Sequence, residues 1–217
     1  MKNGRQVPPR PRRARPAQAR SMAADRPAGK AVPPEPAAPV PAGPTPSGHQ
    51  PVPFPQPCRG LPDGLHPFLA LLPEVLSSPA LRLVGTDRIP GHEVIRSARV
   101  RIVAERGFCW VDETTPCIVL TRPYYESGDA LDLYLDLLHE ATHLRQLLEG
   151  RDVWDESFPY HRRPTEIEGY AVAVAEGRRL GLDAKAIRAH VTNPWMTPAQ
   201  VTELLAAIDD FLDGLRR

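Results

Sequence analysis

Residues 127–150 read SGDALDLYLDLLHEATHLRQLLEG, and this stretch decides the fold. Its leucines recur at spacings of three and four residues, which predicts one long helix that is apolar on most of its sides. We expect Ser127 to cap the first turn, and Gly150 to end the helix after Glu149 at the position that favours a left-handed backbone. A helix this apolar must be buried, so the rest of the domain has to pack around it.

The first 57 residues differ in composition from the rest of the chain. They hold sixteen of the 27 prolines, nine Lys or Arg residues and only two acidic residues, which gives a charge of +7. Such a segment has too little apolar surface to fold, which predicts a disordered basic tail over 1–57 and one folded domain over 58–217. Because the whole chain carries +1, the domain carries −6. We therefore expect no nucleic-acid partner except through the tail, whose arginines can equally be those of a solvated linker.

The rest of the composition bears on the compartment. No stretch approaches the roughly 18–20 unbroken apolar residues of a membrane span, and no apolar secretory segment follows the N-terminal arginines. We therefore expect a cytoplasmic protein without a membrane partner. The chain has three cysteines and no Cys-x-x-Cys pair, which indicates reduced thiols rather than a disulfide framework.

Shorter elements precede the long helix. Apolar residues at helical spacing predict a first helix over 65–76, with Pro67 in its first turn. Segments rich in β-branched and aromatic residues predict strands over 100–103, 108–111 and 117–120.

Further helices are expected after the long one. They are predicted over 164–180, ended by Gly181, and over 184–191 and 198–215. The order of elements predicts an α+β fold, in which helices pack on one face of a small, antiparallel-rich sheet.

The long helix contains the motif His139-Glu140-Ala141-Thr142-His143. Its two histidines are four residues apart, so their imidazoles lie one turn apart on one face and can share a tetrahedral zinc ion. Glu140 projects beside them, where a carboxylate can take a proton from a zinc-bound water and pass it to a leaving amine. This is the His-Glu-x-x-His arrangement of metallopeptidases. The alternative is that both are ordinary histidines, satisfied by neighbouring carboxylates such as Asp136.

A catalytic zinc usually has three protein ligands, so the third must come from elsewhere in the chain. The candidates lie on or just before the following predicted helix and are Glu166, Glu168, Glu176 and His161. We favour Glu166, because small residues share its face and would let that helix approach the metal helix closely. These small residues are Gly169, Ala173 and Gly177.

The other polar residues near the motif have competing interpretations. Glu168 fits the last position of a capping box that starts at Thr165, and Glu176 is expected to be solvated. Asp136 and Gln146 lie one turn before and after the histidines, where either can support a ligand imidazole or simply face solvent. A donor for the oxyanion formed during hydrolysis is expected in the loop before the second helix, and the candidates are Tyr160, His161, Arg162 and Arg163.

These residues resemble the gluzincin clan of metallopeptidases, in which His-Glu-x-x-His is followed by a helix with a Glu-x-x-small-Asp/Asn/Tyr pattern. Here that pattern is Glu166-Ile167-Glu168-Gly169-Tyr170. The resemblance covers about residues 115–181 and extends to small single-domain gluzincins and ImmA/IrrE-like bacterial peptidases. It implies a zincin-like fold and one Zn²⁺ per chain, held by His139, His143 and Glu166 with Glu140 as general base.

Two features depart from the clan. Tyr170 stands where the clan commonly has an acid that supports a zinc ligand, and no Asn-Ala-type substrate-binding strand precedes the helix. The leading hypothesis is a zinc peptidase that acts on a peptide or protein. The alternatives are a metal-binding regulatory module that keeps a zincin fold without productive turnover, and a nucleic-acid-associated protein that uses the basic tail.

Overall fold

The computed structural model describes residues 52–217. Its sheet has four strands in the order β1-β2-β4-β3. The strands are β1 (Gly64–Pro67), β2 (Arg99–Val103), β3 (Cys109–Asp112) and β4 (Cys117–Thr121). The central pair β2 and β4 is parallel, and the two outer pairs are antiparallel. The expected combination of a small sheet with several helices is therefore confirmed, and the sheet is mixed.

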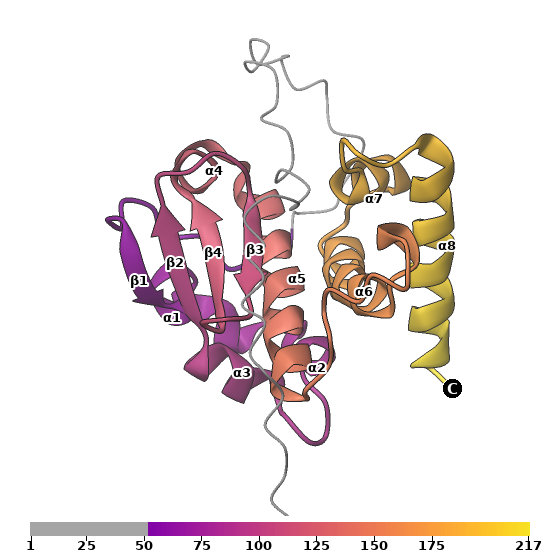
Figure 1. The fold of residues 1–217 in the computed structure, drawn as a ribbon, viewed down its shortest axis with the longest axis horizontal. Coiled ribbons are helices and arrows are strands. Elements are labelled where there is room, and N and C mark those ends of the chain that lie inside the picture. The colour runs from indigo at the N-terminus through magenta and orange to yellow at the C-terminus, as the bar shows by residue number, and fades with distance from the viewer. Residues whose placement is uncertain (1–51) are drawn as a thin grey trace, which may run out of the picture.

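Helix α5 (Ala130–Leu148) lies between the sheet and the C-terminal helices (Figure 1). On its other side lie α6 (Pro164–Arg179), α7 (Ala184–Val191) and α8 (Pro198–Gly214). One apolar cluster joins the sheet to α5, and a second joins α6, α7 and α8. None of the helices within residues 52–217 is both long enough and apolar enough to cross a membrane.

The predicted burial of the long helix is confirmed. Every residue from Leu133 to Gln146 is buried. Gly150 follows the helix with a φ of 76°, as expected for the residue that ends it. The predicted cap is wrong, because the side chain of Asp129 accepts hydrogen bonds from the first-turn amides, whereas Ser127 is the last residue of α4 (Arg122–Ser127).

The predicted helix over 65–76 is also wrong. This region instead forms β1, one turn of helix α1 (Phe68–Leu71) and the 3₁₀ helix η1 (Pro73–Ser77). Leu72 has φ −130° and ψ 73°, outside the helical region, because a proline disfavours helical backbone at the residue before it. The remaining elements are α2 (Leu81–Val84), α3 (Gly91–Ser97) and η2 (Tyr160–Arg162).

Packing of the chain begins before the predicted domain boundary at residue 58. The ring of Phe54 lies against that of Tyr134 on α5, with 5.6 Å between the centroids. The amide of Cys58 donates a 2.7 Å hydrogen bond to the carbonyl of Leu71. Residues 1–51 of the predicted tail lie outside the described residues.

Candidate metal centre

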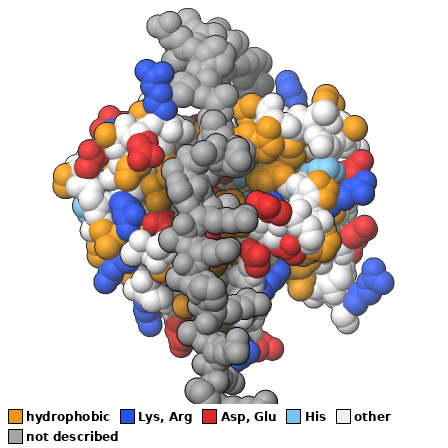
Figure 2. Space-filling model, viewed as in Figure 1, with side chains coloured by type: hydrophobic (Ala, Val, Ile, Leu, Met, Phe, Trp, Pro, Cys, Tyr) orange, Lys and Arg blue, Asp and Glu red, His pale blue; other side chains and the backbone are white. Residues whose placement is uncertain are grey.

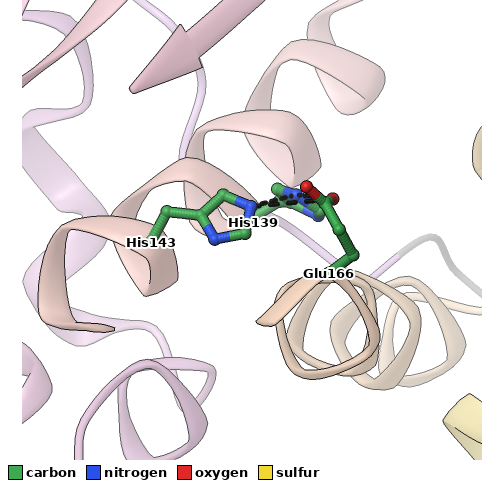
Figure 3. A group of neighbouring side chains, drawn as sticks. All are labelled: His139, His143 and Glu166. Atoms are coloured by element: carbon green, nitrogen blue, oxygen red, sulfur yellow. Dashed lines mark hydrogen bonds and ion pairs between the residues drawn. The ribbon is translucent and has the colours of Figure 1, made fainter. Parts of the chain in front are cut away.

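Three side chains from two helices meet in the interior of the protein (Figure 3). His139 and His143 come from α5, and Glu166 comes from the first turn of α6. Their ligand atoms all lie within 4.8 Å of one another, and all three residues are buried. The structure thus brings together the three residues that the sequence favoured, and this group can hold a metal ion.

The separations between the ligand atoms lie on both sides of the value expected for tetrahedral ligands of one small metal ion. Two ligands bonded to one zinc at about 2.0–2.1 Å lie about 3.3–3.4 Å apart at tetrahedral angles. Oε2 of Glu166 lies 3.4 Å from Nε2 of His139 and 3.7 Å from Nε2 of His143. The two Nε2 atoms lie 2.9 Å apart. Oε2 of Glu166 is buried without a hydrogen-bond partner within residues 52–217, as expected for an oxygen that binds a cation.

The close approach of α6 to α5 depends on small residues. A Cβ atom on Gly169 would lie 3.0 Å from Cε1 of His139. Ala173 is fully buried on the same helix, and a Cβ atom on Gly177 would lie 3.5 Å from a methyl group of Leu135 on α5. The predicted small-residue face of α6 is therefore confirmed, and it places Glu166 at the histidines.

The electrostatics of the group favour a positive charge at its centre. Burial alone would lower the pKa of His143, but the carboxylates of Glu166 and Glu140 raise it to about 9. Burial alone would raise the pKa of Glu166, but the nearby His143 and His139 hold it well below its usual value. Burial lowers the pKa of His139, which favours the neutral imidazole that a metal needs.

Gln146 supports His143, as one of its two interpretations predicted. Oε1 of Gln146 lies 2.7 Å from Nδ1 of His143, on the ring side away from Glu166. Asp136 accepts a 2.6 Å hydrogen bond from the hydroxyl of Tyr124, and its Oδ1 lies 3.8 Å from Nε2 of His190. The negative charge of Asp136 also acts to raise the pKa of His139, against the larger effect of burial.

Glu168 does not take part in a capping box, so that interpretation is wrong. The helix starts at Pro164 with Arg163 before it, and no side chain caps its amides. Glu168 instead forms ion pairs with Arg145 and Arg151 and accepts a 2.8 Å hydrogen bond from Nε2 of Gln146. Burial alone would raise the pKa of Glu168, but these partners hold it below its usual value.

The expectation that Glu176 is solvated is also wrong. Its side chain is 1 % exposed and lies 2.6 Å from Nε of Arg179. The hydroxyl of Tyr134 donates a 2.8 Å hydrogen bond to Oε1 of Glu176, and Ser78 donates a longer one. Glu176 therefore ties α6 to α5 and to the segment before α2.

Of the four candidate oxyanion donors in the loop, two lie away from the metal ligands and two lie near them. His161 and Arg162 both face Glu203 on α8. Oε2 of Glu203 lies 3.3 Å from Nε2 of His161 and 2.6 Å from Nη2 of Arg162. Arg163 lies 3.7 Å from Oε1 of Glu166, and its Nε donates to the carbonyl of Asp155. Tyr160 is the fourth, and it belongs to a polar cluster beside the metal ligands.

This cluster joins the hydroxyls of Tyr160 and Tyr170, which lie 2.9 Å apart, and the side chain of Asn193. Nδ2 of Asn193 donates to the hydroxyl of Tyr170 at 2.7 Å. The ring of Tyr170 packs edge-on against His139, with 4.4 Å between the centroids. Burial and the charge of Glu166 raise the pKa of Tyr160, so its hydroxyl keeps its proton.

Glu140 faces the edge of the sheet. Its carboxylate lies 4.0 Å from Sγ of Cys109 on the edge strand β3, and its charge contributes to the raised pKa values of His143 and Tyr160.

Two buried polar residues near the candidate metal centre were missed from the sequence. Arg145 is a buried cation on α5, and Asn193 lies in the loop before α8. An arginine among the leucines of α5 was the available signal for the first, whereas no local pattern marks the second. Comparison of the chain with protein-family models, with curated proteins and with solved structures found no match.

Proposed function

We propose that the chain is a zinc-dependent peptidase that hydrolyses peptide bonds in a peptide or protein. The observation that carries this proposal is the buried group of His139, His143 and Glu166, with Glu140 next to the first histidine. A zinc ion bound there would lower the pKa of a bound water toward neutrality and polarise a substrate carbonyl. A zincin-like arrangement, with one zinc per chain, is part of the same proposal.

Glu140 is the proposed general base. It lies on the helical turn between the two ligand histidines, and its negative charge raises the pKa of His143. Glu140 is therefore close enough to interact electrostatically with a metal ion at this position. A carboxylate there can accept a proton from the attacking water and deliver it to the leaving amine. Glu140 is 8 % exposed, so little bulk water can reach this carboxylate.

Tyr160 is the proposed donor to the oxyanion. Asn193 donates a hydrogen bond to the hydroxyl of Tyr170, so that hydroxyl can pass its own proton toward Tyr160. The hydroxyl oxygen of Tyr160 then accepts a hydrogen bond from Tyr170, and the hydroxyl proton of Tyr160 is left to donate to the oxyanion. Tyr170, which bonds to Tyr160, packs against His139, and this proximity supports a donor role for Tyr160 at the metal position.

The edge strand β3 supports a peptide as the substrate. An exposed strand edge can pair with an extended peptide through main-chain hydrogen bonds. Cys109 on β3 lies beside Glu140, so a peptide along this edge would pass next to the proposed base.

The proposed activity is tested with a mixed peptide library and two proteins, wild type and Glu140→Gln. Turnover by the wild type that the variant lacks, with equal zinc content, is the expected result, because the amide cannot accept the proton of the water. Zinc binding without any turnover by the wild type would instead favour the regulatory module.

No structural observation favours nucleic acid as a partner of the described domain. Lys and Arg side chains on the face in Figure 2, outside the grey atoms, are interspersed with Asp and Glu rather than gathered in one patch. Binding through the basic tail stays a prediction, and loss of DNA binding with added salt would measure it.

A further inference from the structure

Glu168 lies at the centre of an ionic cluster next to the candidate metal centre. Arg145 and Arg151 both bind its carboxylate, and Arg145 also pairs with Glu149 at 2.6 Å. The side chain of Arg145 is 1 % exposed, and its Nε donates a 3.1 Å hydrogen bond to the carbonyl of Val84. Glu168 is therefore held in one place, by partners on α5 and on the loop that follows it.

This fixed carboxylate, together with the carbonyl of Thr165, orients the amide of Gln146. Nε2 of Gln146 donates to Oε2 of Glu168 at 2.8 Å and to the carbonyl oxygen of Thr165 at 3.1 Å. Both partners are acceptors, so the amide nitrogen must face them. The other end of the amide, Oε1, then faces Nδ1 of His143 at 2.7 Å.

The orientation of Gln146 decides which nitrogen of His143 carries a proton. Oε1 is only an acceptor, so Nδ1 of His143 must be the donor in this hydrogen bond. In the neutral imidazole the lone pair is then on Nε2, which is the atom 3.7 Å from Oε2 of Glu166. A flipped amide would present a donor to Nδ1 and would favour the tautomer whose lone pair points away from the metal position.

We propose that Glu168 is a positioning residue that acts through Gln146 to fix the ring and the tautomer of His143 for metal binding. This inference rests on the proposed metal centre and assigns Glu168 a role in metal affinity without making it a ligand. Removal of a side chain that hydrogen-bonds to a metal-ligating histidine, without itself binding the metal, typically lowers metal affinity by about 10- to 100-fold.

Glu149 provides a matched control within the same cluster. Both glutamates pair with Arg145 and Arg151, but only Glu168 bonds to Gln146. We expect Glu168→Gln to weaken zinc binding by about 10-fold or more in a chelator competition, and Glu149→Gln to stay near the wild type. Equal affinities of the two variants would overturn the proposal.

The double variant separates an action through Gln146 from a general structural effect. If Glu168 acts through Gln146, Glu168→Gln should cost little further zinc affinity in a Gln146→Ala background. Independent losses that multiply in the double variant would contradict the proposal. Thermal melts of the zinc-free proteins show which variants are folded enough for comparison.

A measurement without metal keeps this inference distinct from the proposed function. In zinc-free wild type above about pH 9, where the imidazole of His143 is neutral, the proton on Nδ1 should give a signal in ¹H–¹⁵N NMR spectra. We expect the signal to persist in Glu149→Gln and to be lost in Glu168→Gln. A wild type that binds no zinc would refute the metal centre, whereas a signal that is absent from the wild type or retained in Glu168→Gln would refute the role of Glu168.

Discussion

Gly169 on α6 lies so close to His139 on α5 that a Cβ atom at this glycine would come within 3.0 Å of Cε1 of the imidazole. The pattern Glu166-x-x-Gly169 therefore has a physical meaning in this chain. The glutamate reaches the histidines because the residue one turn later has no side chain to hold the helices apart.

Gly169→Ala should reduce both stability and zinc affinity, because the methyl group forces the ring of His139 to move. Overpacking of this kind costs about 1–3 kcal/mol. Gly177→Ala is the control on the same helix, since its new methyl would meet the flexible ends of Ile187 and Leu182 at 3.0 Å and would make an ordinary contact with Leu135 at 3.5 Å. Thermal melts and zinc competition of both variants measure the effect, and equal zinc affinities would show that the close approach is not needed.

Tyr160→Phe should retain zinc and lower kcat by about 10²- to 10³-fold, as removal of one oxyanion donor does in other hydrolases. Tyr125→Phe is the control, because the hydroxyl of Tyr125 bonds to the carbonyl of Cys58. Steady-state kinetics on one cleaved peptide compare the two variants. If both retain wild-type kcat, the donor is another group.

Glu176→Gln should lower the melting temperature at neutral pH, because Arg179 and Tyr134 lose a buried carboxylate. Burial alone would raise the pKa of Glu176, but these hydrogen bonds hold it below its usual value. Its contribution to stability is therefore complete above the unfolded pKa of about 4.3 and is lost as the pH falls through the lower folded value.

The difference in melting temperature between the wild type and Glu176→Gln should accordingly shrink as the solution is acidified below that range. A difference that grows on acidification would contradict the sign of the shift. Glu203→Gln serves as the control, because Glu203 is 44 % exposed and pairs with His161 and Arg162 near the surface.

Removal of the tail tests the domain boundary. Deletion of residues 2–50 should leave the melting temperature nearly unchanged, because this segment has few apolar residues that could contribute to a core. Deletion of residues 2–57 should lower it, because Phe54 packs against Tyr134. Equal melting temperatures for the two truncations would show that the contact of Phe54 contributes nothing.

The sequence predicted the parts of this protein that depend on local pattern. The apolar periodicity of residues 130–148 and the spacing of His139 and His143 define α5, and the small residues of α6 indicate which glutamate meets it. Each of these patterns lies within a few turns of one helix, so it can be recognised from a single continuous stretch of sequence.

The errors arose where partners come from distant segments. Glu176 is buried rather than solvated because Tyr134 and Ser78, which are far from it in sequence, bond to its carboxylate. Glu168 matched a local capping pattern, but its partners Arg145 and Gln146 lie on another helix. Residues 64–67 form a strand only because β2 lies beside them, and this pairing leaves no local periodicity.

The zinc content of the purified protein tests the central claim most directly. Elemental analysis should find about one zinc per chain in the wild type and a strong loss in both His143→Ala and Glu166→Gln, because two remaining ligands bind zinc poorly. A wild type without zinc, or variants that retain it in full, would contradict the assignment of His139, His143 and Glu166 as a metal centre.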